Sequence, residues 1–197
     1  MELWLSYSLR DFLIFSPDAY FRLYELTNLA LWPFHIPLIL LSLVVLYMIR
    51  LRHVLVQKAL LVWLAIIWLF VGFWFLRTFY SQINTLAYPL SYLFFCEAAL
   101  LVLSGFITSR TVDQESHVTV RTIGGWVLIL YAYFIHPVTA IHWERSFAGI
   151  EVFAVAPDPT AIGTLGFLML LRTRGYLYLM VIPCVWLTFS ILTYMAF

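Results

Sequence analysis

The stretch VFAVAPDPTAIGTLGFLMLL, from Val152 to Leu171, poses the main question about the fold. It is apolar enough to enter a membrane, yet it holds Asp158 between two prolines. From Thr160 to Leu171 a helix would be only ~18 Å long, which is too short to cross ~30 Å of hydrocarbon. We therefore predict a broken membrane segment, in which Val152 to Ala156 runs extended, the Pro-Asp-Pro sequence makes the break and a half-helix completes the crossing.

The half-helix is predicted to begin at Pro159, with Asp158 as its N-cap, because aspartate and proline favour these two positions. Irregular backbone at membrane depth survives only where protein or water covers it, so the segment should lie inside a helical bundle. One face of the half-helix carries small residues and one aromatic residue: Thr160, Gly163, Thr164 and Phe167. Small residues allow close helix contact. This face is either a packing seam without a ligand or part of a functional site.

The composition places the whole chain in the integral membrane class. Of its 197 residues, 64% are hydrophobic and 11% are charged, whereas a soluble domain carries about 25% charged residues. A net charge of +1 argues against a nucleic-acid partner. We predict an all-α integral membrane helical bundle, one transmembrane domain over residues 1–197, with an interfacial N-terminal segment (1–27). This segment is expected to hold an amphipathic helix, which either lies on the membrane surface or extends the first span outward. Six transmembrane segments are expected at about 29–49, 59–76, 85–107, 123–141, 152–171 and 176–197, the fifth being broken.

The positions of the basic residues predict the orientation. Connections on one side of the membrane hold seven of the 11 Lys and Arg residues: Arg50, Arg52, Lys58, Arg110, Arg121, Arg172 and Arg174. The other side holds the remaining four: Arg10, Arg22, Arg77 and Arg145. Cytoplasmic loops are enriched in Lys and Arg. Both termini are therefore expected outside, in the periplasm of a bacterial cell, with the chain in the inner membrane.

Three runs of sequence carry a resemblance to a known family. They are HPVTAIHWERSFAGIEVFAVAPDPTAIGTLGFLMLL (136–171), FYSQINTLAYPLSYLFF (79–95) and LYELTNLALWP (23–33). They resemble a family of bacterial six-span membrane proteins that is catalogued only as a domain of unknown function, and the similarity covers nearly the whole chain. Its most specific part is APDPT, where family members more often have cysteine between the prolines. Asp158 departs from that pattern, which weakens a thiol-based role and favours capping. The resemblance implies a fold and a membrane location, and no reaction.

Glu97 is the most costly residue in the predicted spans. It lies in the middle of one span, in LFFCEAALL, where an ionised carboxylate is expensive and usually faces the protein interior. We expect it to be buried and neutral at pH 7, and to bond to a hydroxyl such as that of Ser42 or Ser190. A structural hydrogen bond and a proton or ion relay are equal alternatives for its role.

The other candidate functional residues lie near the outer ends of the spans. They are His35, His136, Arg77 and Asp158, and the metal-ligand candidates are His136, His142 and Glu144, with Glu151 on the same side. Histidines and a carboxylate could bind a transition metal ion. No HxxxH or HxH spacing supports this, and His136 and His142 face opposite sides of a helix unless Pro137 bends it. The alternative is a set of interfacial histidines that bond to neighbouring helices or water.

Three function classes remain. The first is a non-catalytic accessory subunit, or an assembly or stabilising partner of a larger membrane complex, because helix faces such as WLAIIWLFVGFWFL (63–76) are apolar all round. The second is a small-solute or metal-ion transporter with an outer-side site. The third is a membrane-embedded enzyme, for which the sequence offers no nucleophile–base pair or phosphate loop. Membrane lipids and other membrane-protein subunits are the expected partners, and a lipid is the expected bound molecule.

Overall fold

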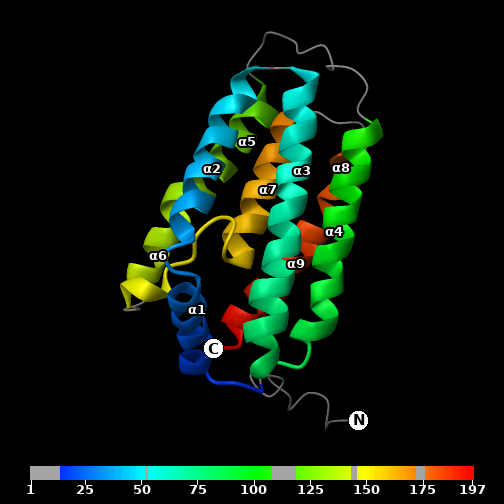
Figure 1. Ribbon diagram of the computed structural model, residues 1–197. Coiled ribbons are helices and arrows are strands. Elements are labelled where there is room, and N and C mark those ends of the chain that lie inside the picture. Colours follow the sequence, from blue (N-terminus) through cyan, green and yellow to red (C-terminus); the bar gives the residue numbers. More distant parts are fainter. Residues whose placement is uncertain (1–13, 52, 108–118, 143–145, 172–175) are drawn as a thin grey trace.

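The computed structural model describes residues 14–51, 53–107, 119–142, 146–171 and 176–197, and Figure 1 shows them as a bundle of helices. Among these residues there is no strand, so the predicted all-helical class is confirmed. The α-helices are α1 (Pro17–Leu31), α2 (His35–Met48), α3 (Val54–Val71), α4 (Ala87–Ile107), α5 (Val120–Leu130), α6 (His136–His142), α7 (Pro157–Leu171), α8 (Tyr176–Leu179) and α9 (Val181–Met195). The π-helices are η4 (Gly72–Phe79) and η6 (Tyr131–Ile135), and the 3-10 helices are η3 (Ile49–Leu51), η5 (Tyr80–Gln82) and η7 (Phe147–Gly149).

Four helical stretches are long and apolar enough to cross a membrane: Val54–Gln82, Ala87–Ile107, Val120–Thr139 and Tyr176–Met195. A fifth is formed by α1 and α2 only if this pair, which is bent by 91°, makes one span. The 15-residue α7 is too short to cross alone, as its sequence indicates. These stretches fit a multi-pass membrane protein, while six crossings stay a prediction.

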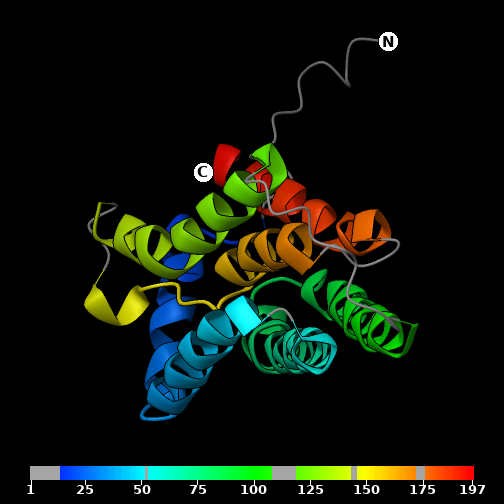
Figure 2. The ribbon, with the colours of Figure 1, turned by 90° about the horizontal axis from the view of Figure 1, so that it is seen from above.

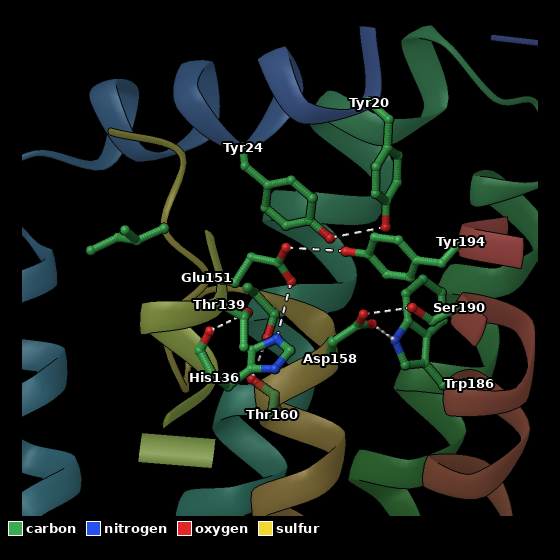
Figure 3. Close-up of polar contacts among 12 residues, drawn as sticks. Tyr20, Tyr24, His136, Thr139, Glu151, Asp158, Thr160, Trp186, Ser190 and Tyr194 are labelled. Atoms are coloured by element: carbon green, nitrogen blue, oxygen red, sulfur yellow. Dashed lines mark hydrogen bonds and ion pairs between the residues drawn. The ribbon is translucent and has the colours of Figure 1, made fainter. Parts of the chain in front are cut away.

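Helix α1 lies below α2 at the lower end of the bundle in Figure 1, and the axes of the two helices are bent by 91°. Figure 3 shows α1 running across this end of the bundle. Ser16 caps α1, accepting a backbone hydrogen bond at 3.2 Å, and a proline takes the first helical position. Tyr20 and Tyr24 are buried against the bundle, whereas Arg22 is exposed. The amphipathic helix predicted from the sequence is therefore present. We call this end, which also holds η5 and Phe197, the α1 end.

Helix α7 lies in the middle of the bundle, with α5, α9 and α3 around it (Figure 2). Most of its residues are buried, which confirms the prediction that this segment lies inside the bundle. It meets α5 at a glycine crossing, where a Cβ on Gly166 would lie 2.7 Å from the carbonyl oxygen of Gly125. Gly163, which the sequence assigned to a helix contact, lies against the ring of Phe153 and near Ala132 of η6: a Cβ on it would lie 2.5 Å from the ring and 3.5 Å from the Ala132 Cβ.

Residues 152–156 form a tight turn before α7, and the predicted extended segment is wrong. Two backbone N–H groups of the turn donate to the carbonyl of Val152, at 3.1 and 2.9 Å. Ala154 has a φ of 72°, a left-handed conformation that residues with a side chain rarely adopt. Thr160 holds the turn, because its Oγ1 accepts from the N–H of Ala154 at 3.1 Å and donates to the carbonyl of Ala156 at 2.6 Å. The turn returns the chain to the bundle interior.

Candidate metal centre

Three side chains of metal-ligand type meet inside the bundle near the α1 end (Figure 3). His136 is the first residue of α6, Glu151 precedes the turn, and Asp158 lies in the first turn of α7. One potential ligand atom from each residue lies within 4.8 Å of the other two. Glu151 is 3% exposed and Asp158 is 4% exposed. One imidazole and two carboxylates at this spacing form a donor set for a divalent transition metal ion.

Asp158 is held by α9 and does not cap α7. The helix begins at Pro157, so Asp158 lies inside its first turn. Its Oδ1 accepts from Trp186 Nε1 at 2.7 Å, and its Oδ2 accepts from Ser190 Oγ at 2.5 Å. Both oxygens are therefore bonded to a neighbouring helix, and the predicted N-cap is wrong. Both donors are neutral, so these bonds orient the carboxyl group without supplying a counter-charge to it.

Glu151 connects His136 to the C-terminal helix. Its Oε2 lies 3.2 Å from His136 Nε2, and its Oε1 accepts from Tyr194 Oη at 3.2 Å. His136 follows directly on the π-helix η6, a kind of turn that is frequent at functional sites. The Nδ1 atom of His136 is buried, and none of the described groups bonds to it. Each carboxylate of the cluster therefore has neighbours that fix its direction.

Two tyrosines of α1 cover the cluster. The Oη atoms of Tyr20 and Tyr24 are 3.0 Å apart, and Figure 3 shows both phenols pointing from α1 toward the carboxylates. The ring of Tyr20 packs against the ring of Tyr194, with centroids 5.9 Å apart. Because both α1 tyrosines are buried, they close this end of the site while presenting hydroxyl oxygens to it.

His35 supports the site from a distance. Its Nε2 lies 3.2 Å from Oδ1 of Asn28. The amide nitrogen of Asn28 donates to the carbonyls of Ala148 and Ile150, at 2.6 and 2.8 Å. These bonds join α1 and α2 to the loop that leads into Glu151. His35 is therefore a neighbour of the loop and does not belong to the three-residue cluster.

Glu97 is fully buried on α4, as predicted, but its expected partners are wrong. Ser42 donates to the carbonyl of Leu38 at 2.7 Å, and Ser190 donates to Asp158. Neither carboxyl oxygen of Glu97 has a hydrogen-bond partner among the described groups.

The remaining predicted site residues do not join the cluster. Arg77 packs on α4, where its Nε donates to Ser91 Oγ at 2.9 Å. The side chain of His142 and all of Glu144 lie outside the described residues. Of the three metal ligands predicted from the sequence, the structure places His136 in the centre.

The residues that surround the centre had a readable signal in the sequence. Trp186, Ser190 and Tyr194 recur every four residues in a span without charged residues, and Tyr20 and Tyr24 have the same spacing. Residues four apart lie on one face of a helix, so each set forms a polar stripe. A polar stripe within a membrane span points to the bundle interior.

Residues 17–197 match the model of a family of unknown function, DUF6064. The chain belongs to this family. The match covers every helix described above, and it confirms the resemblance to a family without an assigned activity. No match was found among curated proteins or solved structures. The bacterial origin and the six spans implied by the resemblance stay predictions.

Proposed function

We propose that this chain is a multi-pass membrane protein that binds a divalent transition metal ion at His136, Glu151 and Asp158, and that it handles the transport of that ion. The observation that carries the proposal is the spacing of the three ligand atoms, within 4.8 Å of one another in the bundle interior. Imidazole and carboxylate ligands suit Zn²⁺ and Mn²⁺. Three protein ligands leave a coordination position for water or for exchange of the ion.

The groups behind the ligands support this proposal. Metal-binding side chains are oriented by outer hydrogen bonds, whose loss typically weakens metal affinity. Asp158 has Trp186 and Ser190 in this role, and Glu151 has Tyr194. A carboxylate with directed neutral donors keeps its remaining lone pairs for a cation.

A transported ion needs a further station along the bundle, and Glu97 offers a buried carboxyl. The ring of Phe94 packs against that of Trp186, with centroids 5.0 Å apart, and Trp186 is bonded to Asp158. Glu97 follows Phe94 by one helical turn of α4, away from the α1 end. Intramembrane carboxylates commonly mark ion pathways.

The decisive experiment is titration of the purified chain in detergent with Zn²⁺ and with Mn²⁺, followed by calorimetry. We expect one ion per chain. Asp158→Asn keeps the size of the side chain and removes its charge. It should weaken affinity for the ion by at least about 10–100-fold, which is the loss already typical when only a partner of a metal ligand is removed.

Glu25→Gln is the matched control, because Glu25 is a carboxylate on α1 that bonds to Arg22 and lies outside the three-ligand group. The affinity of the Glu25→Gln protein for the metal ion should equal that of the unmodified protein. Equal affinities of the Asp158→Asn and Glu25→Gln proteins would disprove the metal site.

We also propose that the α1 end faces the outside, because the connections that the sequence assigns to the other side hold seven of the 11 Lys and Arg residues. Ser146 is exposed at the α1 end, and Val120 is 87% exposed at the opposite end. Cysteines at these two positions, in a chain lacking Cys96 and Cys184, can be probed in intact cells with an impermeant thiol reagent. Labelling of position 120 but not 146 would reverse the orientation.

The accessory-subunit function is the second candidate, and the packing of α2 favours it. Ser42 is the one buried residue of this 14-residue apolar helix. Large side chains such as Leu40 and Tyr47 are 57% and 67% exposed. A helix this exposed has room for another membrane protein, and native mass analysis of the gently solubilised chain tests it. A chain that carries lipid but no second protein at any detergent strength would argue against the accessory role.

A further inference from the structure

Arg77 is a charged residue that the proposed metal centre does not use. It lies in the π-helix η4, on the hairpin that α3 and α4 form. Its guanidinium carbon is 4.6, 4.7 and 4.8 Å from the ring centroids of Tyr88, Tyr92 and Phe95. Three rings around one guanidinium hold it in place by cation–π attraction.

The terminal nitrogens of Arg77 are left for another partner. Its Nε donates to Ser91 Oγ at 2.9 Å, and Ser91 Oγ donates to the carbonyl of Tyr88 at 2.6 Å. Among the described residues, no carboxylate forms an ion pair with Arg77. By contrast, Arg22 on α1 is paired with Glu25 at 2.5 Å. Arg77 is thus a positioned cation without a protein counter-charge among these residues.

The π-helix contributes to this arrangement. The hydroxyl of Thr78 donates at 3.1 Å to the carbonyl of Phe73, five residues earlier. The wider helical turn changes the direction of side chains relative to an α-helix. Arg77 here stands over the face of α4 that carries Tyr88 and Tyr92, which are spaced by four residues.

Helix α1 marks the depth of Arg77 in the bundle. The ring of Tyr24 packs on that of Phe75 at 4.9 Å, and the ring of Tyr20 packs on that of Tyr80 at 5.7 Å. These contacts lie two residues before and three residues after Arg77 in the sequence. Because α1 lies across the end of the bundle, Arg77 lies at the level of a surface helix. This is the depth of lipid headgroups if the bundle spans a membrane.

We propose that Arg77 binds the phosphate of an anionic phospholipid headgroup. Its planar guanidinium offers parallel donors to phosphate oxygens, and the surrounding rings fix its orientation. Tyr88 and Tyr92 are 50% and 52% exposed, as interfacial tyrosines are, and they flank the approach to the guanidinium. A glycerol headgroup such as that of phosphatidylglycerol is favoured, since it keeps the negative charge of the phosphate and brings no ammonium group toward the arginine.

Native mass spectrometry of the full chain in detergent, with phosphatidylglycerol added, tests this proposal. We expect Arg77→Ala to raise the dissociation constant of the tightest lipid about tenfold or more, the loss expected for a charge-assisted contact. Arg77→Lys should lose part of the affinity, because an ammonium group lacks the planar fork. Arg22→Ala is the matched control and should bind lipid as the unmodified protein does.

Two further arms identify the source of the phosphate. The unmodified protein should bind phosphatidylcholine more weakly than phosphatidylglycerol. The Arg77→Ala variant should bind the two lipids with equal affinity. Inorganic phosphate should not displace the lipid. Displacement by inorganic phosphate would overturn the lipid assignment, and so would unchanged phosphatidylglycerol affinity in a folded, monodisperse Arg77→Ala protein. Metal titration of the same variant should be normal, so this proposal and the metal proposal can fail separately.

Discussion

Asp158 and Glu97 are two buried carboxyl groups in the same bundle, with opposite surroundings. Asp158 accepts hydrogen bonds from two α9 donors and lies beside a second carboxylate and an imidazole. Glu97 has no hydrogen-bond partner for either oxygen among the described groups. Burial alone therefore does not tell what a membrane-embedded acid does. The hydrogen bonds separate a carboxyl group that is oriented toward neighbouring ligand side chains from one whose oxygens have no bonded partner among the described groups.

The largest expected effect is the loss of folding stability caused by Asp158→Leu. This substitution leaves the indole N–H of Trp186 and the hydroxyl of Ser190 unpaired in the interior, where each lost partner costs about 1–3 kcal/mol. We expect a loss of about 3 kcal/mol in total, or roughly 10 °C in Tm for a chain of this size. Thermal unfolding in detergent with a chelator measures it.

The matched control is Asp18→Leu, because Asp18 takes the same second position in α1 that Asp158 takes in α7, and it is exposed. Asp18→Leu should remove only the favourable interaction of a carboxylate with the helix N-terminus, which lowers the free energy of unfolding by about 0.3–1 kcal/mol. Equal losses in the two variants would mean that Asp158 acts on its own helix, as the sequence suggested.

A double-mutant cycle shows whether Ser190 interacts with Asp158 or with Glu97. Pairing Ser190→Ala with Asp158→Asn should give a coupling energy of about 1–2 kcal/mol, the scale for contacting residues. Pairing it with Glu97→Gln should give about zero, because the hydroxyl bonds to Asp158. Unfolding free energies of the five variants supply both couplings. The reverse pattern would restore the partner expected for Glu97 from the sequence.

The smallest effect, and one of opposite sign, is expected for Glu97. Replacing a buried polar group that lacks a partner by an apolar one of similar size is nearly neutral or stabilising. Glu97→Leu should therefore raise stability by up to about 1 kcal/mol, and Glu97→Gln should change it little. Thermal unfolding of both variants gives the answer. A marked fall in Tm would reveal a charged partner for Glu97, and the contrast with Asp158 would disappear.

Periodicity and length predicted much of the fold. The helix that begins at Pro17, the burial of the short α7 and the burial of Glu97 all follow from patterns of apolar residues, proline positions and span length. Each depends on neighbours in the sequence or on the thickness of a membrane. The turn at 152–156 was missed, because Ala154 in a left-handed conformation has no composition signal.

The candidate site was harder to predict, because its contacts join distant parts of the chain. Asp158 was assigned to its own helix, since capping is a local rule, whereas its donors lie 28 and 32 residues further on. The sequence placed Glu151 on the same side of the membrane as His136, but no sequence spacing or local rule predicts the distance between these two residues. The polar stripe of α9 was visible in the sequence and indicated which face of that helix is buried. It did not indicate which residue in another helix the stripe contacts.

The source of the Asp158 donors has a consequence for biosynthesis. Trp186 and Ser190 are made after α7, so a ribosome delivers the acidic turn before the groups that satisfy it exist. During that interval a short helix with a bare carboxylate would have to wait at the membrane surface or against its earlier neighbours. Helix α9 then supplies the hydrogen-bond donors for Asp158 of α7. Assembly of this protein would then depend on the insertion of α9.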